Sequence, residues 1–192
     1  MRRLGIFGLA LGLATAGLFL SAGGSSAARH CTIDGTPGPD RLVGTDGPDV
    51  ICGRGGGDVM RGLGGDDTIY GDHGRDRLSG GAGADTIFGG AQNDSIDGGN
   101  ADDVVRGGPD LDLVNGGRGN DAVFGGTGSD IVTGIVGNDV LHGGDGADRC
   151  LDALDGVRGN DTVFGGPGRD HYQADAGDFH FSAEIRGPCI PE

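Results

Sequence analysis

Residues 62–88 read GLGGDDTIY, GDHGRDRLS and GGAGADTIF, which are three consecutive nine-residue repeats. Each has glycine at position 1, aspartate at position 6 and an aliphatic residue at position 8. Thirteen such repeats follow one another without a break over residues 35–151, and two more follow a four-residue insertion at 152–155 and end at residue 173. Self-similarity at a short fixed period indicates a stack of small units instead of one globular core.

The physical chemistry of one repeat predicts its conformation. Glycine accepts positive φ angles and aspartate caps turns, so we expect positions 1 to 6 to form a turn. Positions 7 to 9 then form a three-residue strand with one apolar side chain facing inward. Two repeats make an 18-residue coil, and stacked coils bury a column of valine, isoleucine and leucine between two sheets. The sequence therefore predicts an all-β fold, a parallel β-roll (two-sheet β-solenoid), over residues 35–173.

The aspartate at position 6 is the candidate metal ligand. Stacking brings the aspartates of each edge to about one strand spacing, ~4.8 Å, where unbalanced carboxylates repel one another. A hard cation with oxygen ligands removes this repulsion by using carboxylates and the backbone carbonyls of the glycine turns. Turn capping without metal is the alternative, but capping would accept asparagine or serine as well. The candidate ligands are Asp40, Asp49, Asp58, Asp67, Asp76, Asp85, Asp94, Asp103, Asp112, Asp121, Asp130, Asp139, Asp148, Asp161 and Asp170.

These repeats resemble the RTX, or haemolysin-type, calcium-binding nonapeptide G-G-x-G-x-D-x-U-x, in which U is a large apolar residue. The resemblance covers residues 35–173. It implies a parallel β-roll with Ca²⁺ between the turns of successive coils, so that the aspartate of one repeat works with that of the repeat after next, as Asp40 with Asp58 and Asp139 with Asp161. Position 2 departs from the pattern, because it is glycine in only eight repeats and threonine at Thr36. The turn geometry of the early coils is therefore left open.

The composition favours cations as partners. Aspartate outnumbers glutamate 27 to 2, the basic residues are 14 arginines without lysine, and the net charge is −15. Nucleic acid and anionic membranes are poor partners for such a chain, whereas calcium ions suit it. Removal of a leader with two arginines gives −17, and thirteen filled aspartate pairs would add 26 charges to reach +9. We favour partial occupancy, and an arginine-rich face that stays positive is the alternative.

The two ends of the chain carry no repeats. Residues 1–28 have a basic start (Arg2 and Arg3), an apolar stretch and a run of small residues, which predicts a signal peptide and a secreted protein. An uncleaved membrane anchor is the less favoured alternative, and we expect no membrane span in the mature chain. We expect residues 29–34 to be an N-terminal cap segment. Residues 174–192 are expected to form a C-terminal cap, in which Phe179 and Phe181 alternate as in one more strand.

The four cysteines predict two disulfides in an exported chain. They cluster at the two ends of the repeats, so we favour Cys31 with Cys52 and Cys150 with Cys189. A buried free thiol is the alternative for Cys150.

The sequence does not predict an enzyme. It has no HExxH, no G-x-S-x-G and no EF-hand loop, and its five histidines have no metal-ligand spacing. The favoured function is a secreted calcium-binding repeat protein that folds as it binds several Ca²⁺ ions. The alternative is a calcium-stabilised structural or adhesive protein of the cell surface.

Two further expectations follow from the repeat pattern. Alternate repeats build opposite sheets, so position 9 of the even-numbered repeats forms one outward column that includes Tyr70, Phe88, Phe124 and Phe164. This column is either cross-strand packing or a surface for self-association or for a cell-surface glycan or protein. In addition, position 4 is not glycine in repeats seven to nine, where it is Gln92, Ala101 and Asp110. We expect the calcium sites there to be the weakest.

Overall fold

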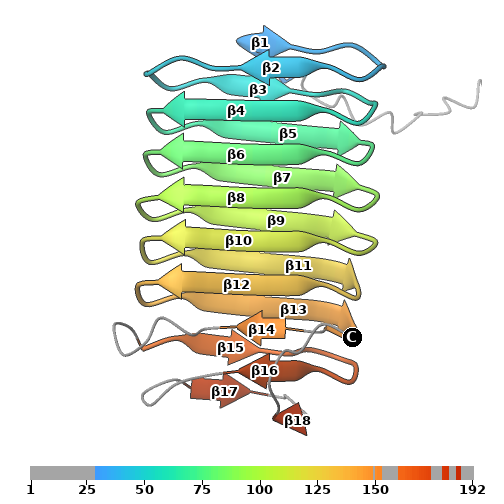
Figure 1. Ribbon diagram of the computed structural model, residues 1–192, viewed down its shortest axis with the longest axis vertical. Helices are drawn as coiled ribbons and strands as arrows, with labels where there is room; N and C mark the ends of the chain where they lie inside the picture. The colour runs from blue at the N-terminus through green and yellow to red at the C-terminus, as the bar shows by residue number, and fades with distance from the viewer. Residues whose placement is uncertain (1–28, 149, 153–159, 174–178, 182–184, 187–192) are drawn as a thin grey trace, which may run out of the picture.

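The computed structural model describes residues 29–148, 150–152, 160–173, 179–181 and 185–186 of the 192-residue chain. These residues form two nine-stranded parallel sheets wound as one β-solenoid (Figure 1). The predicted signal segment, residues 1–28, lies outside the described residues. Within them there is no helix, and so none long and apolar enough to cross a membrane. The predicted all-β parallel fold is confirmed.

The strands alternate between the two sheets along the chain. Sheet A contains, in spatial order, β1 (Ile33–Asp34), β3 (Val50–Cys52), β5 (Thr68–His73), β7 (Thr86–Ala91), β9 (Val104–Pro109), β11 (Ala122–Gly128), β13 (Val140–Gly146), β15 (Thr162–Phe164) and β17 (Phe179–Phe181). Sheet B contains β2 (Arg41–Val43), β4 (Val59–Gly64), β6 (Arg77–Ala82), β8 (Ser95–Asn100), β10 (Leu113–Arg118), β12 (Ile131–Val136), β14 (Cys150–Asp152), β16 (His171–Gln173) and β18 (Ile185–Arg186).

The pairing register repeats every two nonapeptides, which places equal positions of the repeat on top of one another. Val123 pairs with Val105 on one side and with Leu141 on the other. After the insertion the register is kept, because Leu141 pairs with Val163. Residues 179–181 add β17 to sheet A by pairing with β15, in agreement with their predicted strand character.

The strands of the central coils are longer than expected. We predicted three-residue strands over positions 7 to 9, but β7 and β8 each contain six residues and continue through positions 1 to 3 of the next repeat. The prediction was wrong because it assigned the glycine of position 1 to the turn. That glycine instead lies inside the strand with its α-carbon facing the interior, where a larger residue would not fit. Only positions 4 to 6 remain for the turn.

The core is a single column of aliphatic side chains between the sheets. Side chains at position 8 face inward, as predicted, and most are completely buried. Position 6 and position 1 flank position 8 and also face inward, so aspartate and glycine share the interior with the aliphatic column. The buried column contains Ile51, Met60, Ile69, Leu78, Ile87, Ile96, Val105, Val114, Val123, Val132, Leu141 and Val163.

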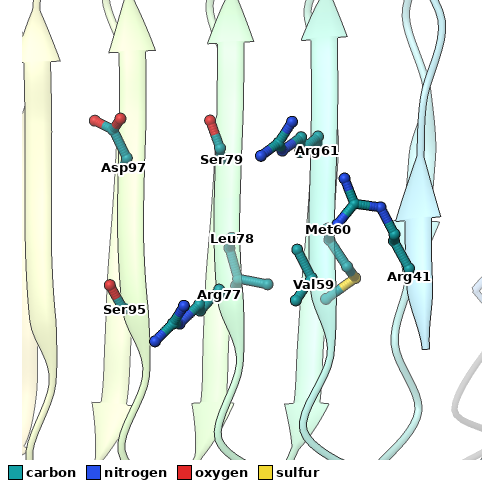
Figure 2. A pocket seen from close by; sticks show the side chains of 9 residues that line it. All are labelled: Arg41, Val59, Met60, Arg61, Arg77, Leu78, Ser79, Ser95 and Asp97. Atoms are coloured by element: carbon teal, nitrogen blue, oxygen red, sulfur yellow. The ribbon is translucent and has the colours of Figure 1, made fainter. Parts of the chain in front are cut away.

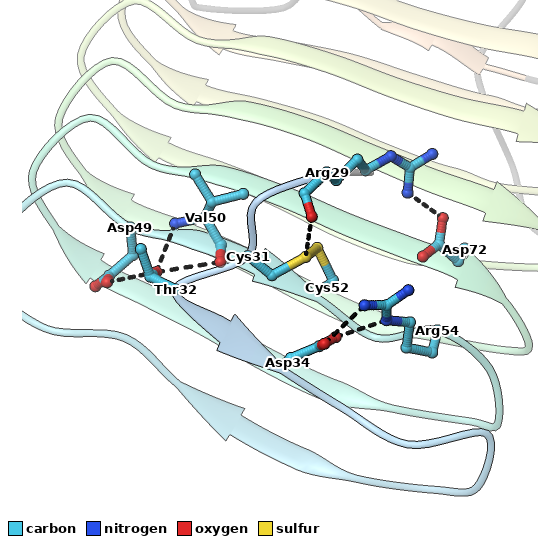
Figure 3. The surroundings of a disulfide bond; sticks show 9 residues. All are labelled: Arg29, Cys31, Thr32, Asp34, Asp49, Val50, Cys52, Arg54 and Asp72. Carbon is cyan, nitrogen blue, oxygen red and sulfur yellow. Dashed lines mark hydrogen bonds and ion pairs between the residues drawn. A yellow bond between two sulfur atoms is a disulfide. The ribbon is translucent and has the colours of Figure 1, made fainter. Parts of the chain in front are cut away.

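A disulfide and a set of polar contacts close the N-terminal end. The predicted Cys31–Cys52 disulfide is present and joins the segment before β1 to β3 (Figure 3). The Arg54 guanidinium donates to both carboxylate oxygens of Asp34, at 2.6 and 2.7 Å. The second predicted disulfide cannot be followed, because Cys189 and the side chain of Cys150 lie outside the described residues.

Candidate metal sites

The position-6 aspartates lie immediately before each strand with their carboxyl groups turned into the solenoid. From Asp58 to Asp170 none of the thirteen is more than 4% exposed. Asp49 is 8% exposed and Asp40, in the first repeat, is half-buried. Such burial is unusual for a carboxylate and requires compensating partners.

Hydrogen bonds join the aspartates of successive coils into two ladders, one for each parity of the repeats. In each step the main-chain N–H of one aspartate donates to Oδ1 of the aspartate one coil later, as from Asp85 to Asp103 at 2.7 Å. The contact begins with Asp40 and Asp58, at 2.8 Å. It crosses the insertion from Asp139 to Asp161, at 2.7 Å. The aspartates of repeats n and n+2 are therefore in direct contact, and that each pair shares a Ca²⁺ ion, as the resemblance implies, stays a prediction.

The second carboxylate oxygen has no donor in most of these residues. In ten of them Oδ2 is buried and makes no hydrogen bond, which leaves its desolvation uncompensated. This orphaned oxygen lies at the same place in each of the ten repeats, which points to a shared requirement for a positive group and not to an isolated packing defect. The ten residues are Asp58, Asp67, Asp76, Asp85, Asp94, Asp103, Asp112, Asp121, Asp130 and Asp148.

Glycine at position 1 keeps a small cradle open beside each orphaned oxygen. A β-carbon on Gly89 would lie 2.6 Å from Asp94 Oδ2 and 2.6 Å from the carbonyl oxygen of Gly107, one coil later. The cradle thus brings together a carboxylate oxygen and a backbone carbonyl oxygen from successive coils, which is the donor set that Ca²⁺ takes. The residues present fit the ion, and the fit also explains why position 1 is glycine in every repeat.

Burial raises the pKa of the ladder carboxyls well above the ordinary aspartate range. Desolvation is the main cause, and the N–H donated by the preceding coil offsets it only in part, as at Asp85, where the pKa rises to about 6. In the middle of the stack it rises to about 7, at Asp94, Asp103 and Asp112. These carboxylates hold their negative charge unfavourably until a cation compensates it.

A family model supplies independent evidence for the repeats. The model of the RTX calcium-binding nonapeptide repeat (four copies) matches residues 34–69, 53–87, 70–105, 79–114, 97–132, 124–150 and 152–178. The chain belongs to the RTX calcium-binding nonapeptide repeat family. A comparison with curated proteins gave no match.

The first two RTX repeats satisfy their aspartates in a different way. Thr36 donates its N–H to Asp40 Oδ2 at 2.6 Å and its hydroxyl to the same atom at 2.9 Å. Thr45 does the same for Asp49, at 2.7 and 2.9 Å. The backbone N–H of Thr45 is the main cause that lowers the pKa of Asp49, whereas the pKa of its equivalents further along is raised. Our sequence reasoning noted threonine at position 2 but missed this consequence.

Two positions of the RTX repeat have positive φ in the central coils, position 4 in the turn and position 2 within the strand before it. Gln92, Ala101 and Asp110 at position 4 have φ angles of 79°, 79° and 83°, in the region that glycine accepts and other residues occupy at a cost. Position 2 occupies the same region, which the sequence reasoning missed; Leu63 there has a φ of 85° and Ile135 a φ of 81°. Each non-glycine residue in this region carries about 1 kcal/mol of backbone strain. That the calcium sites around Asp94, Asp103 and Asp112 are the weakest stays a prediction.

The predicted outward column on sheet A is confirmed in its register. Tyr70 pairs with Phe88, and further along Phe124, His142 and Phe164 follow one another. Their rings stack nearly parallel, with centroids 5.0 Å apart for Tyr70 and Phe88 and 4.4 Å apart for His142 and Phe164. The ring faces therefore contact each other, and it is mainly their edges that point to solvent.

Proposed function

We propose that the chain is a secreted calcium-binding repeat protein whose solenoid folds as Ca²⁺ ions bind between stacked turns. The observation that carries the proposal is the row of buried Oδ2 atoms without donors, most of them beside a backbone carbonyl oxygen of the next coil, as Asp94 Oδ2 lies beside the carbonyl of Gly107. Calcium suits these irregular oxygen cradles better than magnesium, because Mg²⁺ demands near-octahedral geometry and retains its waters. No catalytic activity is part of this proposal.

All fifteen position-6 aspartates remain candidate ligands, but they are not equivalent. We propose that the thirteen from Asp58 to Asp170 hold the ions, because they share one buried ladder geometry. Asp40 and Asp49 would contribute least, since Thr36 and Thr45 already donate to their Oδ2 atoms. Partial occupancy of the ladder therefore has a structural basis at its N-terminal end.

Two observations support secretion, one from the sequence and one from the structure. The predicted signal peptide supplies the route, and the Cys31–Cys52 disulfide suits an oxidising compartment. Proteins with these repeats are typically extracellular, where calcium is present at millimolar level, within the range that extracellular modules bind.

Calcium titration followed by circular dichroism tests the proposal. Protein in excess chelator should show little β-strand signal near neutral pH, and calcium should restore it cooperatively, with a midpoint on the order of 10⁻⁴ to 10⁻³ M. Asp148→Asn removes a buried ladder carboxylate and should lower the number of ions bound. Asp145→Asn removes an exposed carboxylate from the same repeat and should leave that number unchanged. Equal strand content in chelator and in calcium would overturn the proposal.

A structural or adhesive role that uses the aromatic column is the alternative function. The stacking of Tyr70 on Phe88 and of Phe124 on His142 supports a stiffening role for the column along sheet A. Replacing Phe88 and Phe124 together by serine tests for a partner surface. Loss of self-association or surface binding in a variant that still folds with calcium would favour the adhesive function.

A further inference from the structure

The outer face of sheet B carries a groove of about 330 Å³ near the N-terminal end of the stack. It crosses β2, β4, β6 and β8, and three arginines, Arg41, Arg61 and Arg77, project along it (Figure 2). The positive charge of this face contrasts with the net charge of the whole chain, which is −15.

The strand register creates both the groove and the spacing of the arginines. Arg41, Val59 and Arg77 follow one another in one row across β2, β4 and β6. In the adjacent row Arg61 on β4 is followed by Ser79 on β6. Large and small side chains thus alternate both along each strand and across the strands, and the groove lies over the small ones. Arg41 and Arg77 are two strands apart, about 10 Å at the backbone, with Arg61 on the strand between them.

None of the three guanidinium groups is neutralised by the protein. Across the part of the chain that the structure describes, the ion pairs are those of Arg29 with Asp72 and of Arg54 with Asp34. The repeat aspartates do not pair with these arginines, because their carboxyl groups face the interior. One carboxylate, Asp97, lines the far end of the groove and accepts a hydrogen bond from Asn115 instead. The groove therefore has three positive charges and one negative charge.

We propose that this arginine groove binds a sulfate or phosphate ester carried on a carbohydrate chain. Guanidinium groups present forked N–H donors that match such oxyanions, and the hydroxyls of Ser79 and Ser95 add uncharged donors at the same face. The volume is at the small end of the range for ligand sites and suits one or two ester groups with part of a sugar. Three cations along about 10 Å fit a chain with repeated charges better than a single ion.

Binding at the groove depends on calcium for two reasons, and this part rests on the proposed function. The three arginines come from strands that are 18 or more residues apart in sequence, so the groove exists only when the coils are stacked. In addition, the acidic ladder repels anions until bound cations neutralise it. Calcium therefore has two effects on the groove: it stacks the strands that form it, and it cancels the negative potential that would repel an anionic ligand.

Dextran sulfate, dextran phosphate and neutral dextran are suitable probes, measured by calorimetry with the full mature chain in millimolar calcium. We expect binding to at least one of the two charged polymers and none to neutral dextran, and the tighter of the two identifies the ester. Replacing Arg41, Arg61 and Arg77 by serine should weaken that binding on the order of tenfold or more, with an unchanged calcium-folding curve. Binding of neutral dextran, or of neither charged polymer, would overturn the proposal.

A matched control variant distinguishes binding in the groove from a general effect of net charge. In this control Arg75, Arg118 and Arg169 are replaced by serine, which removes the same three positive charges at exposed positions outside the groove. It should keep binding within about twofold of the unsubstituted chain. Equal losses in the two triple variants would refute the groove. A chain that is folded in chelator and binds there would instead overturn the calcium dependence and leave the groove standing.

Discussion

Acid should replace calcium in folding this chain. The perturbation is removal of calcium at about pH 8, followed by acidification to about pH 5. Seven ladder carboxyls have a folded-state pKa of about 6 or about 7, against an ordinary value of 3.8. Because the folded pKa is the higher one, the folded state binds more protons than the unfolded chain across this window. Stability is therefore greatest below about pH 4 and falls as the pH rises through 6 and 7.

The magnitude of this effect decides whether the calcium-free fold survives at neutral pH. Raising the pKa of one carboxyl from 3.8 to about 6, as at Asp85, lowers the free energy of unfolding by about 3 kcal/mol once the pH exceeds both values. Even at half this size, seven such contributions would equal about 10 kcal/mol, which is comparable with the whole stability of an ordinary domain. The calcium-free solenoid should therefore be unfolded at about pH 8.

Far-ultraviolet circular dichroism of calcium-free protein measures this directly. The strand signal should be present at about pH 5, disappear by about pH 8 and return at about pH 8 when calcium is added. A second readout is proton release, because calcium added at about pH 5, where the calcium-free chain is folded with its ladder carboxyls protonated, should displace several protons per chain. A calcium-free chain that is as unfolded at pH 5 as at pH 8, or calcium binding without proton release, would refute the reasoning from burial.

Three further predictions concern the backbone and the N-terminal end. Ala101→Gly should raise the free energy of unfolding by about 1 kcal/mol in denaturant titrations with calcium, because it relieves a positive φ of 79°; Ala91→Gly, in a strand without positive φ, should lower it. Gly107→Ala should destabilise the fold strongly, because the added carbon would lie 2.5 Å from the Oδ2 atom of an interior aspartate, whereas Gly38→Ala meets nothing closer than 3.9 Å and serves as its control. Reduction of the N-terminal disulfide, which closes a separation of 21 residues, should lower stability by about 3 kcal/mol and raise the calcium concentration needed for folding; an unchanged calcium midpoint would contradict this.

Periodicity alone was sufficient for most of the architecture. The nine-residue period predicts which side chains form the core, and its parity predicts that Phe88 and Phe124 belong to one face. Both follow from geometry that repeats identically in every coil. The length of the strands could not be predicted in the same way, because glycine was taken as a turn former. In the stack its missing side chain is needed inside the strand, beside an aspartate.

The features that the sequence did not predict depend on contacts between coils. The hydroxyl bond from Thr45 to Asp49 requires the exact turn of that repeat, and the positive φ of Leu63 appears only when position 2 is placed against its neighbours. The groove of Arg41, Arg61 and Arg77 needs the lateral register of three strands. The sequence of a single repeat does not predict the threonine hydrogen bond, the positive φ or the groove.

The alternation of sheets gives the chain a structural reading frame of two repeats. Deleting one nonapeptide between Phe88 and Phe124 would move every later strand to the opposite sheet, so that Phe124 and His142 together would leave the face of Phe88 and appear on the face of the arginines. Deleting two would shorten the rod by one coil and leave both faces in phase. The insertion at 152–155 obeys the same frame, since it adds residues without moving Val163 from its place beside Leu141. Length in this protein can therefore change in whole coils, or by an insertion that keeps the strand register, without altering what either face displays.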